Sequence, residues 1–546
     1  MRPIRAALLI ALLVPASVSA APPTLTYLYP AGGQRGSTIE VTAAGTFERW
    51  PVNAWADQRG VQVKPAKERG KLLVTVAADV PPGVCWIRLA DEQGASGLRP
   101  FLIGTLPEVM EREPNDEPAK AQSLGAGNVT VNGRLEKPGD VDVFALDLRK
   151  GQTLVASMEA NHTLKSPMDA VLQVLSDKGF VLEQNDDHRG LDPQIVFTVP
   201  RDGRYLVRTF AFPSTPDASI RFAGAETFVY RLTLTTGGFA DYASPLAVSR
   251  ATPGEVEVVG WNIPPAVKRL PVAVLPGSDT GTLFHPQLAN TVRVRLEPHP
   301  IVVEKEPNNR QQPQRVEVPV TITGRIARPG EVAVYEFALK KGQKVPVTIE
   351  SRTLDFPLDP VLRLTDGSGK LLTQAQAKKL GTDPELTVTA TADAIYRIEV
   401  SDLHSDGGPR FVYRLRLAVP QPDFALTVAS DRFALKPGDT LDIPVTVERR
   451  AGFKDDIEIT AVGLPAGINA QPVRAAAAGK SVVLRLTGTD TFSAGAFQIV
   501  GRTPGKAEWV RIARAPVVEV GAATEHLWVT MSKTATVAKQ PKGKKK

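Results

Sequence analysis

The stretch EREPND, from Glu111 to Asp116, recurs as EKEPNN from Glu304 to Asn309. The landmarks that follow keep the same order in both places. NGRLEKPGDVDVFALDLRKGQ begins at Asn132 and matches TGRIARPGEVAVYEFALKKGQ, which begins at Thr323. Both copies close with nearly the same segment, FVYRLTL and FVYRLRL, and the offset between the copies drifts only from 193 to 183 residues. The middle of the chain therefore contains two copies of one module, which we call the first and second repeats.

The local pattern inside each repeat is that of short β-strands. Alternating runs such as Val141 to Leu148 and Tyr205 to Phe210 are bounded by Pro-Gly, Asp-Gly and Lys-Gly turns. Asp202-Gly203 lies between two such runs, which predicts a tight hairpin there. The 44 Gly and 46 Pro favour many turns, and no segment shows a sustained helical period. We therefore predict an all-β chain of tandem antiparallel β-sandwiches.

Composition and pattern together predict a multidomain chain. Its 546 residues suffice for about three to five domains. The segment between the repeats is short for a full sandwich, so it is predicted as a small β module or a linker. The predicted order is a signal peptide (1–20), an Ig-like β domain (21–105), the first repeat (106–236), the small module or linker (237–301), the second repeat (302–420), a second Ig-like β domain (421–521) and a Lys-rich tail (522–546).

The first residues have the pattern of an export signal. Arg2 and Arg5 precede an apolar run from Ala6 to Val14, and Val18-Ser19-Ala20 is a small-residue cleavage site. The apolar run is too short to span a bilayer as a helix, although a membrane anchor is the alternative interpretation. We therefore expect a secreted protein, in the periplasm, on the cell surface or outside the cell. The single Cys, Cys85, excludes an internal disulfide and is expected to be a buried strand residue.

The order of motifs in the repeats resembles the bacterial pre-peptidase C-terminal (PPC) domain. The first repeat carries Glu113-Pro114-Asn115-Asp116, then Asp140-Val141-Asp142-Val143-Phe144, then Asn185-Asp186-Asp187 and Asp202-Gly203-Arg204-Tyr205. The resemblance covers residues 108 to 236 and 302 to 419, and the flanking domains resemble only generic Ig-like domains. It implies jelly-roll-like β-sandwiches on a secreted bacterial protein, and related collagen-binding domains bind calcium through the opening acidic segment.

The acidic residues of the first repeat have the chemistry of a calcium site. Calcium takes six to eight oxygen ligands from carboxylates, amides and backbone. Five carboxylates close together would repel one another, and a divalent cation would remove that cost; the alternative is a solvated acidic surface. Since extracellular modules bind calcium at about 10⁻⁴ to 10⁻³ M, a structural role is expected. The predicted ligands are Glu111, Glu113, Asn115, Asp116, Asp140 and Asp142.

The second repeat departs from this donor set. Asn309 replaces Asp116, Glu331 replaces Asp140 and Ala333 replaces Asp142. Gln374 to Ala377 stands where the first repeat has its Asn-Asp-Asp loop. Glu304, Glu306 and Asn308 remain, but fewer formal charges predict weaker metal binding. Calcium is therefore expected chiefly in the first repeat.

No common catalytic motif is present. The sequence lacks His-Glu-x-x-His and Gly-x-Ser-x-Gly, and its six His residues stand singly. We therefore predict no catalytic residues and a non-catalytic binding, adhesion or accessory protein. The alternative is a secreted hydrolase, a peptidase or glycosidase of unrecognised type, with its site around Asp186 and Asp187, beside His188.

The expected partners are extracellular. We predict binding to a polysaccharide, to another protein or to a separately encoded exported enzyme. Trp50 and Trp55, close together in RWPVNAWAD, are candidate sugar-stacking residues, with core packing as the alternative.

The charge pattern argues against a general nucleic-acid binder. The formal charge is +7, but two Arg of the signal and six Lys of the tail supply +8, which leaves −1 for the rest of the chain. The basic character therefore belongs to the two ends, and contact with nucleic acid or another anionic polymer is expected only from the Lys-rich tail.

Overall fold

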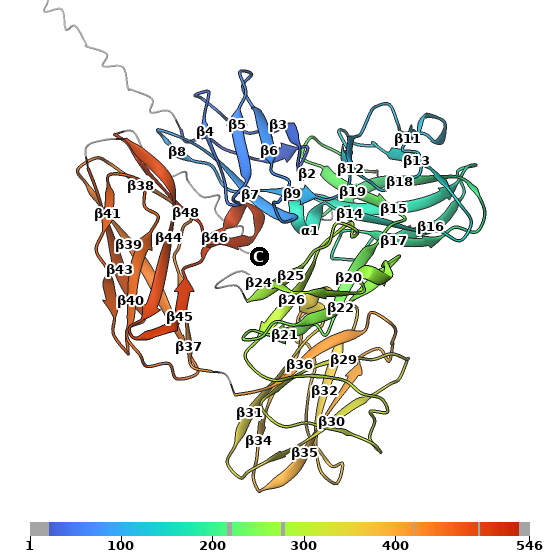
Figure 1. The fold of residues 1–546 in the computed structure, drawn as a ribbon, viewed down its shortest axis with the longest axis vertical. Coiled ribbons are helices and arrows are strands. Elements are labelled where there is room, and N and C mark those ends of the chain that lie inside the picture. Colours follow the sequence, from blue (N-terminus) through green and yellow to red (C-terminus); the bar gives the residue numbers. More distant parts are fainter. Residues whose placement is uncertain (1–20, 216–220, 275–278, 420, 490–491, 534–546) are drawn as a thin grey trace, which may run out of the picture.

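A computed structural model describes residues 21–215, 221–274, 279–419, 421–489 and 492–533 (Figure 1). The predicted signal peptide and the end of the predicted tail lie outside these residues. Within them almost every element is a strand, and the sheets pack in pairs, which confirms the all-β fold class. None of the described helices has the length and apolar character needed to cross a membrane. The helices are α1 (Asn161–Leu164), η1 (Pro118–Lys120), η2 (Pro265–Val267), η3 (Arg352–Leu354) and η4 (Val518–Val520).

The N-terminal sandwich packs a sheet of order β1-β3-β6-β5 against one of order β2-β9-β7-β4, with β8 beside β7. Alternation along β6 sends every second residue into the core. Cys85 is fully buried there, between apolar neighbours. The strands are β1 (Tyr27–Tyr29), β2 (Gly32–Gln34), β3 (Thr38–Ala44), β4 (Asn53–Ala56), β5 (Val61–Pro65), β6 (Lys71–Val76), β7 (Gly83–Asp91), β8 (Gly94–Ala95) and β9 (Arg99–Gly104).

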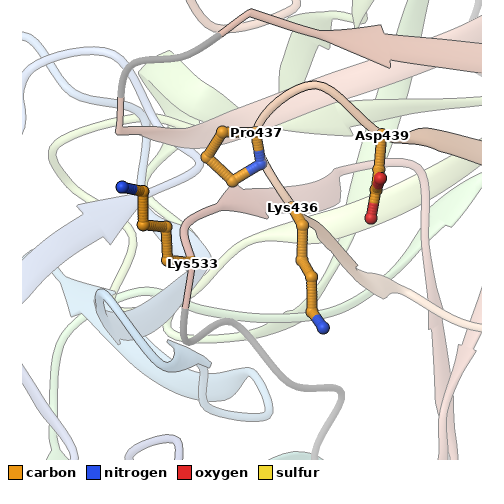
Figure 2. Close-up of a pocket in the computed structure, with 4 residues that line it drawn as sticks. All are labelled: Lys436, Pro437, Asp439 and Lys533. Carbon is orange, nitrogen blue, oxygen red and sulfur yellow. The ribbon is translucent and has the colours of Figure 1, made fainter.

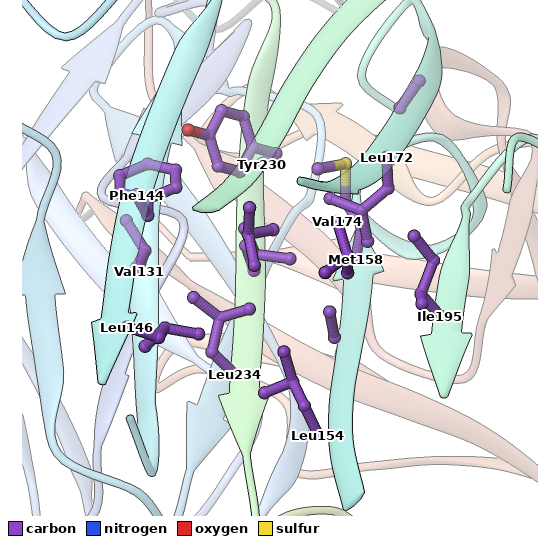
Figure 3. Packing of buried hydrophobic residues seen from close by; sticks show 14 of the residues in the cluster. Val131, Phe144, Leu146, Leu154, Met158, Leu172, Val174, Ile195, Tyr230 and Leu234 are labelled. Atoms are coloured by element: carbon purple, nitrogen blue, oxygen red, sulfur yellow. The ribbon is translucent and has the colours of Figure 1, made fainter. Parts of the chain in front are cut away.

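The first repeat is a sandwich of two five-stranded sheets, β10-β12-β19-β14-β17 and β11-β13-β18-β15-β16. Large apolar side chains from both sheets meet between them (Figure 3). The predicted hairpin at Asp202-Gly203 is wrong, because β17 and β18 belong to different sheets and the turn carries the chain across the core. The strands are β10 (Glu108–Met110), β11 (Gln122–Ser123), β12 (Val129–Arg134), β13 (Asp142–Leu148), β14 (Thr153–Glu159), β15 (Met168–Ser176), β16 (Val181–Asn185), β17 (Gln194–Thr198), β18 (Gly203–Pro213) and β19 (Val229–Thr235).

The segment between the repeats forms a middle module with a core of its own. Its sheets have the orders β20-β22-β23 and β21-β26-β25-β24. It is therefore a compact β module and not a linker, since two apolar sheet faces cover each other. The strands are β20 (Phe239–Ser244), β21 (Ala247–Ser249), β22 (Glu255–Trp261), β23 (Arg269–Pro271), β24 (Ala273–Val274), β25 (Thr280–Leu283) and β26 (Val292–Glu297).

The second repeat reproduces the strand order of the first. Its sheets are β27-β29-β36-β31-β34 and β28-β30-β35-β32-β33. The same opening strand again runs parallel to its neighbour, β10 to β12 and β27 to β29. The strands are β27 (Ile301–Val303), β28 (Gln314–Arg315), β29 (Val320–Arg325), β30 (Ala333–Leu339), β31 (Lys344–Glu350), β32 (Pro360–Asp366), β33 (Leu371–Ala375), β34 (Glu385–Thr389), β35 (Ala394–Asp402) and β36 (Val412–Leu417).

The C-terminal sandwich pairs β37-β39-β43-β41 with a sheet of order β38-β48-β44-β40-β42. The predicted start of the tail at residue 522 is wrong, because β48 is buried between β38 and β44. The strands are β37 (Asp423–Thr427), β38 (Arg432–Leu435), β39 (Thr440–Arg450), β40 (Ile457–Val462), β41 (Ile468–Ala470), β42 (Val473–Ala475), β43 (Ser481–Gly488), β44 (Ser493–Thr503), β45 (Lys506–Ile512), β46 (Ala515–Val517), β47 (Ala522–Thr524) and β48 (Leu527–Met531).

The middle module is a reduced copy of the N-terminal sandwich. In both, the first strand pairs antiparallel with the third, and the second strand runs parallel to the last. Each then docks on its following repeat through one apolar cluster, with Ala31 and Val229 in the first case and Leu246 and Val412 in the second. The chain is therefore a duplicated pair of modules. We call residues 21–236 the first unit and 237–419 the second unit.

The C-terminal sandwich packs back on the N-terminal sandwich, so that the first and last modules of the chain are neighbours (Figure 1). An ion pair joins Arg88 and Asp431, whose side chains are each only 1% exposed. Leu98 packs on Val517 and Val520 beside it. A buried charge pair of this kind is costly to break, because either partner alone would be an uncompensated charge.

Candidate metal centre

Three segments of the first repeat bring acidic side chains to one corner of the sandwich. The segment after β10 carries Glu111 and Glu113, and β13 begins at Asp142. A carboxylate oxygen from each of these three residues lies within 4.8 Å of the others. Asp116 is half-buried nearby, and its charge contributes to raising the pKa of Glu113 and of Asp140, after the larger effect of burial. The structure therefore places all six predicted ligands in one neighbourhood.

Three of these side chains are fully buried and incompletely satisfied. Asn115, Asp140 and Asp142 each show 0% exposure. Among the described residues, the Oδ1 atom of each has no hydrogen-bond partner, and neither has the Nδ2 atom of Asn115. A buried polar atom left without a partner costs about 1–3 kcal/mol. Oxygen atoms in this condition are what a hard cation such as calcium binds.

One oxygen each of Glu111, Glu113 and Asp142 is held in place by a hydrogen bond. The backbone N–H of Arg134 donates to Glu111 Oε2 at 2.5 Å, and that of Asn115 donates to Glu113 Oε2 at 3.0 Å. The hydroxyl of Tyr230 donates to Asp142 Oδ2 at 2.5 Å. These bonds fix the carboxylates in position without neutralising them, because none of the donors is charged.

Burial and mutual repulsion disfavour the charged forms of these acids. Burial raises the pKa of Glu111 to about 7, and the charges of Glu113 and Asp140 add to the effect. The pKa of Asp142 is raised well above its ordinary value, first by burial and then by Glu111. Burial also raises the pKa of Asp140 and of Glu113. A divalent cation would compensate this excess of negative charge.

Two polar residues at the site were not predicted from the sequence. Tyr230 lies in the closing segment that both repeats share, so its near-identity in the two copies was an available signal. Thr209 lies opposite Asp142 in the β13–β18 register, is fully buried, and its Oγ1 atom has no hydrogen-bond partner among the described residues. No sequence signal marked Thr209, because its place beside Asp142 depends on strand register.

In the corresponding corner of the second repeat, buried polar side chains bond one another and the backbone. Asn308, the counterpart of Asn115, donates to Glu304 Oε1 at 2.7 Å and accepts from the backbone N–H of Val334 at 3.0 Å. Ala333 stands at the position of Asp142, and its register partner is Val400 in place of a threonine. The hydroxyls of Tyr335 and Tyr413 bond each other at 2.7 Å.

The two tryptophans proposed for sugar stacking are both partly buried. Trp50 packs on Phe47 with ring centroids 5.5 Å apart, and its Nε1 donates to the carbonyl of Ala66. Trp55 packs on His526 and Trp528 of the C-terminal sandwich, at 5.3 and 6.2 Å. Both rings therefore make packing contacts, one inside a module and one between two modules.

The loop considered for a hydrolase does not assemble an acid–base pair with its histidine. Asp186 and Asp187 are exposed. Burial, with the charges of Arg410 and Arg189, lowers the pKa of His188 to about 3. His188 is therefore neutral at physiological pH.

A pocket of about 390 Å³ lies on the C-terminal sandwich, lined by Lys436, Pro437, Asp439 and Lys533 (Figure 2). Figure 2 shows the two lysine side chains projecting separately. The pocket lies in a different module from the acidic corner and shares none of its residues.

Comparison with known proteins found matches to parts of this chain. The chain matches no protein-family model. A stretch of 139 residues, 25% of this chain, is 32% identical to the "Probable subtilase-type serine protease" of Deinococcus radiodurans. The match spans only 18% of that protein's length.

Solved structures that resemble parts of the chain are distant in sequence. The pre-peptidase C-terminal domain of a collagenase from Bacillus anthracis is 16% identical, over 21% of this chain and 99% of that domain, with a TM-score of 0.17. The fibronectin(III)-like modules of CbhA from Clostridium thermocellum are 11% identical, over 42% of this chain and 93% of those modules, with a TM-score of 0.13. The D0–D1 domain of intimin is 11% identical, over 39% and 97%, with a TM-score of 0.14.

Proposed function

We propose that this chain is an exported, non-catalytic protein of tandem β-sandwiches in which calcium stabilises the first repeat. The observation that carries the calcium proposal is the set of buried oxygens of Asn115, Asp140 and Asp142 that have no partner within the described chain. They lie beside two further carboxylates whose pKa values are raised. A site of this composition is unfavourable when empty and favourable with a dication bound.

The donor set matches the preferences of calcium. The oxygens of Glu111, Glu113, Asp140 and Asp142 would supply negative charge, and Asn115 a neutral amide oxygen. Asp116 lies at the edge of the same group. Calcium would supply positive charge that neutralises the carboxylates and would link the segment after β10 to the start of β13. We therefore assign it a structural role.

Calcium-dependent unfolding of the full chain tests this proposal. At a free calcium concentration about 100 times Kd, the first repeat should gain about 2.7 kcal/mol of stability. Calorimetric scans with calcium and with a chelator should show this gain for the wild type and its loss for Asp142→Asn. The matched control is Glu306→Gln in the second repeat, which should keep the full gain. Equal melting temperatures with and without calcium would contradict the proposal.

The ligand that we propose for the protein is an extracellular polysaccharide, another protein or a separately encoded exported enzyme. Support comes from the architecture, in which packed sandwiches hold many exposed loops on a rigid frame. Retention on insoluble polysaccharides, with the wild type and with Trp50→Ala and Trp55→Ala, tests the sugar-binding version. Because both rings make packing contacts, the melting temperature of each variant should be measured in parallel. Equal retention of all three proteins would remove the tryptophans from the binding surface.

A secreted hydrolase is the second candidate, and the match to a subtilase-type protease favours keeping it under test. Protease and glycosidase assays on the mature chain, with and without calcium, separate the two candidates. We expect no turnover. Reproducible turnover that disappears in Asp187→Ala would replace the first proposal with the second.

A further inference from the structure

The first unit holds the second unit through one face, and the contacts on that face are specific. Thr105 Oγ1 donates to the carbonyl of Leu288 at 3.1 Å, and the guanidinium of Arg35 lies 5.0 Å from the ring centroid of Phe284. The side chain of Asn262 donates to the carbonyl of Thr153 in β14 at 2.8 Å. All three contacts join the middle module to the N-terminal sandwich or to the sheet β10-β12-β19-β14-β17 of the first repeat.

The same face of the second unit is open. In the register of the duplicated modules, β21 corresponds to β2, and Pro298 to Thr105. Here the structure shows an apolar groove of about 540 Å³ instead of a docked module. Its lining includes Val248, Pro300, Ile301 and Val303, and His299 is the one titratable residue in the lining that the structure describes. Val303 is 46% exposed.

A second element of this face is uncovered as well. The loop before β17 in the first repeat and the loop before β34 in the second are equivalent, because each ends in an aspartate that caps three consecutive backbone N–H groups. Asp192 caps residues 160–162 and Asp383 caps residues 351–353. In the first repeat this loop lies against Arg410 of the second unit, whose charge acts on His188. In the second repeat the loop carries Leu380, which is 100% exposed.

The outer surface of the sheet between the groove and the Leu380 loop is also more exposed in the second repeat than in the first. Val155 on β14 is fully buried, whereas Pro346, at the equivalent position on β31, is partly exposed. β27 beside the groove and β34 beside Leu380 are the two edges of one five-stranded sheet. Four strand spacings of about 4.8 Å put these edges roughly 19 Å apart. The exposed side chain of Leu380 and the apolar groove therefore lie at opposite edges of one surface.

We propose that this surface is a dimer interface, in which Leu380 of each copy enters the groove between β21 and β27 of a second copy. A projection and a groove on the same surface are self-complementary about a two-fold axis, because each copy then supplies one to the other. Among the described residues, the lining of the groove includes no Lys, Arg, Asp or Glu, so a leucine entering it would bury no charge from that lining. The corresponding surface of the first unit is covered by a β-sandwich module of this chain, so this face already makes a contact between modules in one of its two copies.

Sedimentation velocity of the full chain over a range of concentrations tests the proposal. The wild type should show a monomer–dimer equilibrium, and Leu380→Asp and Val303→Glu should each be monomeric at concentrations where the wild type is dimeric. Both positions are exposed, so melting temperatures should be unchanged. The control is Phe180→Asp, which removes an apolar side chain, 69% exposed, from the first repeat and should leave the dimer intact. A monomeric wild type, a dimer that survives Leu380→Asp, or a dimer lost in Phe180→Asp would overturn the proposal.

Disulfide trapping tests the specific contact. The native thiol of Cys85 is fully buried, and burial raises its pKa, so it should not compete. Mixing a Val303→Cys chain with a Leu380→Cys chain under mild oxidation should give a covalent dimer that exceeds what either variant forms alone. Equal yields from the mixture and from the separate variants would exclude the proposed arrangement.

Discussion

The first and second repeats share one strand order and differ at one buried corner. In the first repeat, Asp142 faces Thr209 across the β13–β18 register and accepts a hydrogen bond from Tyr230. In the second, Ala333 faces Val400, and the equivalent tyrosine, Tyr413, bonds Tyr335 instead. The fold therefore does not need the acidic group, because the second copy closes the same corner with apolar side chains and a tyrosine pair.

The asparagine common to both corners sharpens this contrast. Asn308 has partners for its amide and its carbonyl oxygen, whereas the Asn115 side chain is equally buried with none among the described residues. Each unpartnered group of this kind costs about 1–3 kcal/mol. Asn308 shows that the second repeat avoids this cost. The unpartnered side chain of Asn115 in the first repeat therefore points to a ligand that removes the cost there.

Placing an aspartate in the second repeat, at the position equivalent to Asp142, should have the largest effect on stability. Ala333→Asp would bury a carboxylate next to Val400, beside Glu304 and Glu306 but without the unpartnered asparagine oxygen that we assign to a cation in the first repeat. We expect the free energy of unfolding of this repeat to fall by about 3 kcal/mol or more, with no recovery on adding calcium. Urea unfolding measures the loss. Ala338→Asp, at an exposed position on the same strand, is the matched control and should cost far less. A stable Ala333→Asp protein would show that this corner tolerates charge without an ion.

Removing the tyrosine hydroxyls should separate a stability effect from a metal effect. Tyr230→Phe and Tyr413→Phe each delete one buried hydrogen bond and should each cost about 1 kcal/mol in urea unfolding. Only Tyr230→Phe should weaken calcium binding, because only Tyr230 holds a proposed ligand. Equal calcium affinities in the two variants would mean that Tyr230 does not position Asp142.

The smallest expected effect at neutral pH concerns the loop that is covered in the first repeat and open in the second. The pKa of His188 is lowered to about 3, below its ordinary value near 6.5, so protonation favours the unfolded chain. The stability that depends on neutral His188 is therefore complete above about pH 6.5 and is lost as the pH falls toward 3, by at most about 1.4 kcal/mol per pH unit.

Urea midpoints at several pH values should show a shallower acid loss for His188→Asn than for the wild type. Lys379→Gln, at the equivalent position of the open loop, is the control and should follow the wild type. If the urea midpoints of the wild type and of His188→Asn fall equally with pH, the claim that burial lowers the pKa of His188 is contradicted.

The all-β class was predicted correctly because alternation is a local signal. The repeated EPN segment, also a local signal, led to the six acidic and amide ligands, which stay a prediction. Tyr230 and Thr209 were missed because their place beside Asp142 depends on which strands pair and in which register. β48 was missed because all its residues are buried, which removes the alternation that marks a half-exposed strand. The packing of Trp55 on His526 was not predictable from local pattern, because the two residues come from opposite ends of the chain.

Isothermal titration of the full chain with calcium tests the central claim most directly. The account predicts one site per chain with Kd of about 10⁻⁴ to 10⁻³ M, abolished by Asp142→Asn and unaffected by Glu306→Gln. Absence of binding at several millimolar calcium, or a site that survives Asp142→Asn, would contradict it.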